Sequence, residues 1–237
     1  MARPNNSVLI AFSVHLFTAS GAFWAFLALV AAAEENFTIM WFWLGVALLV
    51  DGVDGPLARY FNVKSVLPNW SGELLDCIID FVTFALIPAF ALYQSGFLKE
   101  TYSFICAALI VCTSAIYYAN TGMKTRDNCF VGWPICWNML VFTLFVLEPG
   151  WYIAFAAVII SAILSFVPVL FVHPVRVKAW RPMTLFVFAI WSLCGIIALY
   201  CSYFGLDLPG FALIGIAASG LYLYCVGFVL QYLGKVI

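Results

Sequence analysis

The sequence predicts an all-α fold, a polytopic membrane bundle of about eight transmembrane helices. The 237 residues are 66% hydrophobic and 9% charged, with a mean hydropathy of +1.08. A soluble domain has about 45–50% apolar and about 25% charged residues, so this class of protein is excluded. The apolar residues also fall into stretches of about 20, which is the length that crosses a bilayer as a helix.

Eight apolar stretches are separated by short segments that are polar or rich in proline and glycine, such as residues 33–36, 94–100 and 205–210. We expect the spans near residues 8–33, 37–60, 71–95, 100–120, 133–147, 150–171, 183–204 and 208–234. The fifth is short for a span and would be tilted or supported by its neighbours. We expect a single integral-membrane domain over residues 1–237, with a core at about 8–171 and extra helices at about 183–234.

The distribution of basic residues predicts the orientation, because cytoplasmic loops accumulate Lys and Arg. An even number of spans places both termini on one side of the membrane. That side would hold nine of the ten basic residues, namely Arg3, Arg59, Lys64, Lys124, Arg126, Arg176, Lys178, Arg181 and Lys235. We therefore expect both termini, and the acidic cluster described next, at the cytoplasmic face. The basic residues could also hold lipid phosphates, or they could serve orientation alone.

An acidic cluster interrupts the apolar sequence. Five carboxylates lie within thirty residues, at Asp51, Asp54, Glu73, Asp76 and Asp80. An ionised carboxylate inside a span costs about 2.5–3.5 kcal/mol on insertion scales, so such a cluster indicates a functional site.

Helical spacing brings four of these carboxylates together. Asp51 and Asp54 recur with Ala58 at i, i+3 and i+7 in the second span. Asp76 and Asp80 recur with Gly72 at i, i+4 and i+8 in the third. The two spans run in opposite directions, so their stripes can face each other at the same depth.

Four converging carboxylates require either raised pKa values or bound cations. The eight cysteines are scattered, and no histidine stands at ligand spacing from the aspartates. Oxygen ligands alone favour Mg²⁺ or Mn²⁺ over zinc. Two such divalent cations would balance the charge, and a pair of metals suits phosphoryl transfer.

Small residues accompany the carboxylates at Gly52, Gly55, Ala58 and Gly72. They could expose backbone to a nucleotide diphosphate lying across the helices, with Arg59 nearby. They could equally serve helix packing through small faces.

These residues carry a resemblance to a known family. The string DGVDGPLAR, followed by Gly72, Asp76 and Asp80, is similar to the D-x-x-D-G-x-x-A-R … G-x-x-x-D-x-x-x-D signature of the CDP-alcohol phosphotransferase family. Twelve residues separate Arg59 from Gly72, more than in most of the family. This gap, the chain length and the eight expected spans resemble the bacterial members that join CDP-diacylglycerol to free choline.

The resemblance implies a catalytic core of six helices, often found in homodimers. The membrane would be a bacterial inner membrane, and the site would open to the cytoplasm. Metal ligands would be Asp51, Asp54, Asp76 and Asp80, and Asp80 would also be the catalytic base. The nucleotide site would be formed by Gly55, Ala58, Arg59 and Gly72. The substrates would be CDP-diacylglycerol and choline, with CMP released.

The acceptor site is expected to recognise a quaternary ammonium group, which has no N–H to donate. Aromatic faces suit such a cation, and one carboxylate could accompany them. The candidates are Tyr117, Tyr118, Trp133, Asn120 and Glu73, with Trp70 close to the metal helix. The segment Phe130–Pro134 also resembles the family's connection between the fourth and fifth helices, and Pro134 would suit a first helical turn. Each aromatic could instead anchor the chain at the membrane interface.

Other functions stay open at this point. A related transferase, such as a phosphatidylserine synthase, would use the same carboxylates. An ion-coupled transporter also uses intramembrane carboxylates, although its charges would be expected near the bilayer midplane. Here the aspartates cluster towards one end of their spans, beside small residues.

Overall fold

The computed structural model describes residues 6–236, so Arg3 lies outside the described part of the chain. Within that part, six helices are long and apolar enough to cross a membrane. Two shorter apolar helices, α7 (Trp137–Leu147) and α8 (Trp151–Leu164), accompany them. These observations confirm a polytopic helical membrane protein. The chain forms two compact units, one up to Ile87 and one from Pro88 onward, and each is described by itself.

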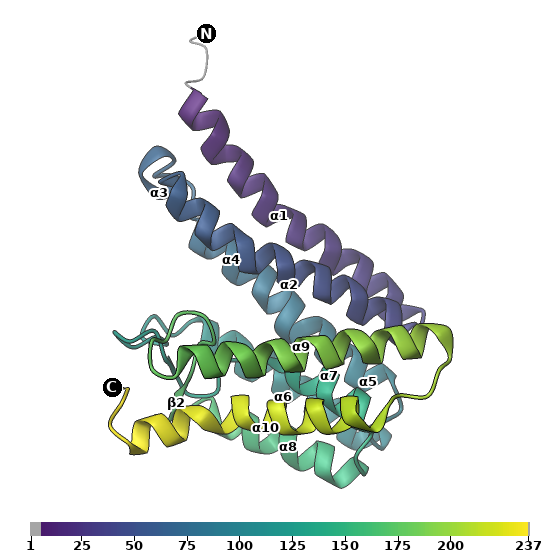
Figure 1. Cartoon of the computed structure of the whole chain (residues 1–237). Helices are drawn as coiled ribbons and strands as arrows, with labels where there is room; N and C mark the ends of the chain where they lie inside the picture. Colours follow the sequence, from purple (N-terminus) through teal and green to yellow (C-terminus); the bar gives the residue numbers. More distant parts are fainter. Residues whose placement is uncertain (1–5, 237) are drawn as a thin grey trace. The chain divides into compact units, whose positions relative to one another are not determined.

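The first unit is built around its N-terminal helix. It contains α1 (Asn6–Ala33), α2 (Phe37–Tyr60), α3 (Val63–Val66), α4 (Gly72–Asp80) and the π-helical segment η1 (Phe81–Leu86). In Figure 1, α1 and α2 run side by side, and α1 also contacts α3, α4 and η1. The first helix therefore serves as the common support of the two helices that carry the aspartates.

Polar side chains set the starts of the two aspartate-bearing helices. The Asn36 side chain accepts a hydrogen bond from the Ile39 amide at 3.2 Å and so caps α2. The Ser71 hydroxyl accepts one from the Leu74 amide at 3.1 Å and caps α4. Each cap satisfies a backbone donor that the helix itself cannot pair.

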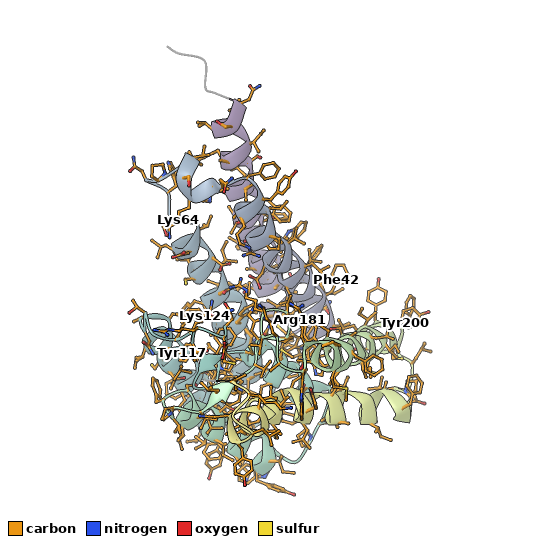
Figure 2. All side chains as sticks on the ribbon, turned by 60° about the vertical axis from the view of Figure 1, so that its left-hand side comes forward. Phe42, Lys64, Tyr117, Lys124, Arg181 and Tyr200 are labelled. Atoms are coloured by element: carbon orange, nitrogen blue, oxygen red, sulfur yellow. The ribbon has the colours of Figure 1, made fainter. Side chains whose placement is uncertain are left out.

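The second unit contains α5 (Ile87–Gln94), α6 (Glu100–Tyr118), β1 (Phe130–Val131), α7, α8, β2 (Leu170–Phe171), α9 (Arg181–Phe204) and α10 (Gly210–Tyr232). In Figure 1, α9 and α10 run side by side, and α10 also contacts α7 and β2. Arg181 and Tyr200 lie at opposite ends of α9 (Figure 2). The extra helices expected after the core, α9 and α10, are thus packed into this unit.

Side-chain hydrogen bonds join helices of this unit that otherwise pack through apolar side chains. The hydroxyls of Ser161 on α8 and Tyr224 on α10 are 2.9 Å apart. Trp191 on α9 donates to Thr143 on α7 at 3.4 Å. Such bonds matter in a membrane, because lipid tails are as apolar as the side chains and the hydrophobic effect does not drive helices together there.

Two expected boundaries are wrong. The sixth stretch was expected to reach residue 171, but α8 ends at Leu164 and residues 170–171 pair with β1. Pro168 explains the break, since it has no amide hydrogen and disfavours helical backbone at the residue before it. The fifth expected span was to begin at residue 133, but its helix, α7, begins at Trp137, so Pro134 is not in its first turn. The left-handed backbone at Ile135, with φ of 62°, lies between Pro134 and the helix start.

Candidate active site

Three aspartates from two helices meet in the first unit. Asp51 on α2 and Asp76 and Asp80 on α4 each offer a carboxylate oxygen, and these atoms lie within 4.8 Å of one another. All three side chains are half-buried. The facing stripes expected from the sequence are therefore present, and the three carboxylates are close enough to share a cation.

Asp54 lines the same small cavity but is buried, with 6% of its surface exposed. The cavity measures about 10 Å³, which is room for about one water molecule or one ion. Its donors are carboxylate oxygens, the ligands of hard divalent cations. A single Mg²⁺ or Mn²⁺ fits this space and this donor set, whereas a substrate would have to bind on its open side.

The helix that carries Asp76 and Asp80 changes its winding directly after them. η1 begins at Phe81, and the Thr83 hydroxyl donates to the Ile79 carbonyl at 3.0 Å. Thr83 also lines the cavity. Single π turns occur frequently at functional sites, because the extra residue displaces the backbone groups around it.

The first helix supplies residues that sequence reasoning missed. Thr18 and Gly21 of α1 line the cavity of the aspartates. His15 lies one turn earlier, is 7% exposed, and its Nε2 has no hydrogen-bond partner among the described residues. A polar or small residue every third position in an apolar span was the signal that could have revealed this face.

His15 lies against the glycine at the start of α4. A Cβ added to Gly72 would stand 3.3 Å from the His15 Cε1 atom. A Cβ added to Gly21 would stand 3.0 Å from the Cγ2 atom of Ile79. Both glycines thus permit close approach of α1 and α4. Gly72 is one of the small residues singled out from the sequence, whereas Gly21 was not.

The other expected nucleotide residues lie along α2. Ala58 packs against the apolar cluster of Ala11, Val14 and Val63, whereas Gly55 is half-buried and Arg59 is exposed. A Cβ added to Gly52 would meet nothing within 4 Å. This face of α2 is open enough for a ligand to approach its backbone.

The expected acceptor residues have different surroundings. Tyr117 on α6 is 2% exposed and its hydroxyl has no partner among the described residues, while Tyr118 is half-buried. Trp133 is 4% exposed and packs edge-on to Trp137 at 4.4 Å between ring centroids. Trp137 in turn donates to Ser114 of α6, one turn before Tyr117. Trp133 and Trp137 therefore form a buried aromatic pair, and a hydrogen bond joins this pair to the helix that carries Tyr117.

The polar acceptor candidates are engaged locally. The Asn120 side chain accepts a hydrogen bond from the Gly122 amide at 2.9 Å and closes its own turn. Glu73 pairs with Lys64 at 3.6 Å, and both side chains are almost fully exposed. Lys64 is on the short helix α3, beyond the end of α2 (Figure 2). Trp70 is exposed and lies edge-on to Phe12.

Comparison with known proteins agrees with the geometry. The model of the CDP-alcohol phosphatidyltransferase family matches residues 8–167, which include the aspartates. A phosphatidylcholine synthase of Brucella melitensis biotype 1 is 60% identical over 93% of this chain and 79% of its own length. Proteins of the same name from Mesorhizobium japonicum and Rhizobium meliloti are 56% and 55% identical, over 94% and 95% of this chain and 87% and 92% of their own lengths. With its aspartates paired across α2 and α4 within the matched region, this chain belongs to the CDP-alcohol phosphatidyltransferase family.

Proposed function

We propose that the protein is a phosphatidylcholine synthase, which transfers the phosphatidyl group of CDP-diacylglycerol to choline and releases CMP. The observation that carries the proposal is the meeting of Asp51, Asp76 and Asp80 within 4.8 Å in a membrane protein. Relatives named phosphatidylcholine synthase, at 55–60% identity, support the choice of acceptor.

The cofactors would be two divalent cations, Mg²⁺ or Mn²⁺, held by Asp51, Asp54, Asp76 and Asp80. When bound, they would supply positive charge to the diphosphate and to the departing CMP. The small cavity has room for about one ion, so the same four aspartates would have to hold the second outside it.

Asp80 would act as the general base. It accepts the proton of the choline hydroxyl while that oxygen forms a bond to the phosphorus bearing diacylglycerol. The bond from this phosphorus to the CMP oxygen breaks, and CMP leaves with the electron pair. Since Asp80 is half-buried and directly precedes η1, its carboxylate is held at a defined place along α4.

The nucleotide would lie along α2, near Gly52, Gly55 and Arg59 on its open face and beside Ala58, which packs against the cluster of Ala11, Val14 and Val63, and near the start of α4 at Gly72. We infer that His15 also contacts the substrate, because its buried Nε2 has no partner among the described residues and lies beside Gly72. A buried polar atom without a partner in the protein is commonly satisfied by a ligand or by water.

The choline site would use aromatic faces, with Tyr117, Tyr118 and Trp133 as its candidates. Because Tyr117 and Trp133 are buried, alanine at either position would leave a cavity and weaken the fold. Conservative changes to Phe are therefore the useful probes. Both termini, and the site, would face the cytoplasm of a bacterial inner membrane, and the protein would act as a homodimer.

The test is a substrate panel with purified protein. Radiolabelled CDP-diacylglycerol is offered choline, serine, inositol or glycerol 3-phosphate, and the lipid product and CMP are quantified. We expect phosphatidylcholine from choline alone. Phosphatidylserine as the main product would reassign the acceptor, and no product with any alcohol would reopen the transporter alternative.

A further inference from the structure

A basic cavity lies in the second unit and shares no lining residue with the aspartate site. It has a volume of about 250 Å³. Four cations line it, Arg126, Arg176, Lys178 and Lys235, together with one carboxylate, Asp127. The space equals about eight water molecules, so it takes a headgroup rather than a single ion.

Three loop segments form this cavity, and each is fixed by buried neighbours. Val177 stands between Arg176 and Lys178, and Val236 follows Lys235. Both valines belong to one apolar cluster with Cys129 and Leu230, and they are 1% and 4% exposed. Because the alternate residues are anchored in this core, the charged side chains between them are directed to the surface.

Backbone hydrogen bonds hold the same segments. The Thr125 amide donates to the Cys129 carbonyl at 2.9 Å and closes the turn that carries Arg126. The Lys235 amide donates to the Leu230 carbonyl at 2.9 Å after the end of α10. The Lys235 ammonium lies 5.2 Å from the ring centre of Trp180, just before α9. The cavity is thus a built feature of the fold rather than a chance gathering of long side chains.

The positive charge of this region also acts on a half-buried neighbouring ring, that of His173. Burial, followed by the charges of Arg176 and Lys124, lowers the pKa of His173 to about 4. A cavity with four cations and one carboxylate favours an anionic ligand, and guanidinium groups pair well with phosphate oxygens. A zwitterionic choline headgroup carries its own cation, which this potential would repel.

The position of the cavity favours a lipid over a soluble phosphate. Residues of the cavity adjoin the start of α9 and the end of α10, both of which are long enough to span the membrane. Spans end at the headgroup level of the bilayer. Large exposed apolar residues, Val175, Tyr232 and Leu233, stand beside the basic ones in sequence and could contact acyl chains.

We propose that this cavity binds the phosphate headgroup of an anionic phospholipid. Of the basic residues that line it, Arg176, Lys178 and Lys235 lie beyond residues 8–167, which match the family. The proposal concerns binding and does not depend on the reaction that the aspartates catalyse.

The experiment measures which lipid the protein retains. Full-length protein, delipidated in detergent, is incubated with equal amounts of phosphatidylglycerol and phosphatidylcholine and repurified, and bound lipid is quantified by mass spectrometry. We expect wild-type protein to retain phosphatidylglycerol preferentially. The double change Arg176→Gln with Lys235→Gln should lower this preference about tenfold.

A matched pair separates the cavity from general surface charge. Lys99→Gln with Arg181→Gln also removes one Lys and one Arg, and neither residue lines the cavity. The match is close, because Lys99 also lies over an aromatic ring, that of Trp151, at 4.7 Å. This variant should keep its preference within about twofold; an equal loss in both pairs, or in neither, overturns the proposal.

Two further arms cover folding and the source of the phosphate. If the double variant is not monodisperse in size exclusion, Arg126→Gln is compared with Arg181→Gln, and only the first should lose preference. Glycerol 3-phosphate, a headgroup without acyl chains, is then added as competitor. Displacement of phosphatidylglycerol at equal concentration would show a soluble-phosphate site and overturn the assignment to a lipid.

Discussion

The four aspartates of the candidate active site fall into two degrees of burial, from which we expect two kinds of role. Asp54 is buried, whereas Asp51, Asp76 and Asp80 are half-buried and close together. A substrate hydroxyl cannot easily reach a buried carboxylate, so we expect Asp54 to act as a ligand alone. A half-buried one can both bind a cation and exchange a proton with substrate.

Asparagine substitutions should separate the ligands from the base. We expect Asp51→Asn, Asp54→Asn and Asp76→Asn to weaken Mn²⁺ binding at least tenfold and to abolish turnover, because one charged ligand is lost. Asp80 is also a proposed ligand, so Asp80→Asn should weaken Mn²⁺ binding too; with saturating Mn²⁺ it should retain CDP-diacylglycerol binding but lose at least a hundredfold in kcat. Equilibrium dialysis with Mn²⁺ and steady-state kinetics measure the two properties; an Asp80→Asn enzyme with half of the wild-type kcat would move the base elsewhere.

His15 provides a second test at the scale of single residues. Replacing His15 by Leu keeps its bulk but removes the unpaired Nε2, so the KM for CDP-diacylglycerol should rise about five- to tenfold, the value of one hydrogen bond. The KM for choline should stay the same. His15→Gln, which restores a polar atom, should recover part of the loss; equal effects of Leu and Gln would mean that the residue acts through packing alone.

His173 makes the stability of the second unit depend on pH. Its pKa in the folded protein is about 4, mainly because it is buried, whereas an unfolded chain titrates near 6.5. Between these values the unfolded state binds more protons, so stability is present above pH 6.5 and falls as the pH drops towards 4. His173→Phe keeps a ring beside Phe130 and cannot titrate. Its melting temperature should fall less than that of wild type between pH 7 and pH 5; parallel curves would contradict this assignment.

At the scale of elements, one helix approaches a strand at backbone distance. A Cβ added to Gly227 of α10 would overlap the Leu170 carbonyl oxygen of β2. The Gln231 side chain accepts a hydrogen bond from the Leu170 amide at 3.0 Å, one turn further along α10. β2 therefore pairs with β1 and is also contacted by α10, at Gly227 and Gln231.

Gly227→Ala should destabilise this contact. The added methyl group would meet backbone atoms of Leu170 and Phe171, and backbone cannot move aside as a flexible side chain can. We expect a cost of about 1–3 kcal/mol and a melting temperature lower by several degrees, measured by thermal unfolding in detergent. Gly210→Ala is the matched control, since a Cβ there meets nothing within 4 Å. Equal melting temperatures for the two variants would show that α10 can shift at no cost.

Apolar length and helical spacing were sufficient to predict most of the elements and the meeting of Asp51 with Asp76 and Asp80. They failed where the backbone departs from regular helix. Residues 165–171 are apolar, yet Pro168 and pairing with β1 end the helix earlier. The residues of the π turn after Asp80 are mostly ordinary apolar types that do not distinguish it from α-helix. His15 looked like one isolated polar residue in an apolar span. The strand pairing and the π turn depend on tertiary contacts, which spacing along one segment does not contain. The spacing of His15, Thr18 and Gly21 is present in the sequence, but it does not say which helix this face meets.

At the scale of the whole molecule, catalysis should depend on divalent cations. Chelation should abolish phosphatidylcholine formation, and Mg²⁺ or Mn²⁺ should restore it. Ca²⁺ should not, because its larger and looser coordination would misplace the diphosphate. The assay follows CMP release after exhaustive dialysis against chelator; full activity in the chelated protein would refute the role of the aspartates as ligands.

The convergence of three carboxylates on one small space also links folding to the ionic composition of the cell. Without a cation, the like charges of α2 and α4 repel each other, and the packing of both helices on α1 opposes that repulsion. An ion that binds the folded state at a hundred times its dissociation constant adds about 2.7 kcal/mol of stability. The melting temperature should therefore rise with Mn²⁺ in the wild type and stay flat in Asp76→Asn. A cell depleted of divalent metal would then lose the folded enzyme itself as well as its turnover.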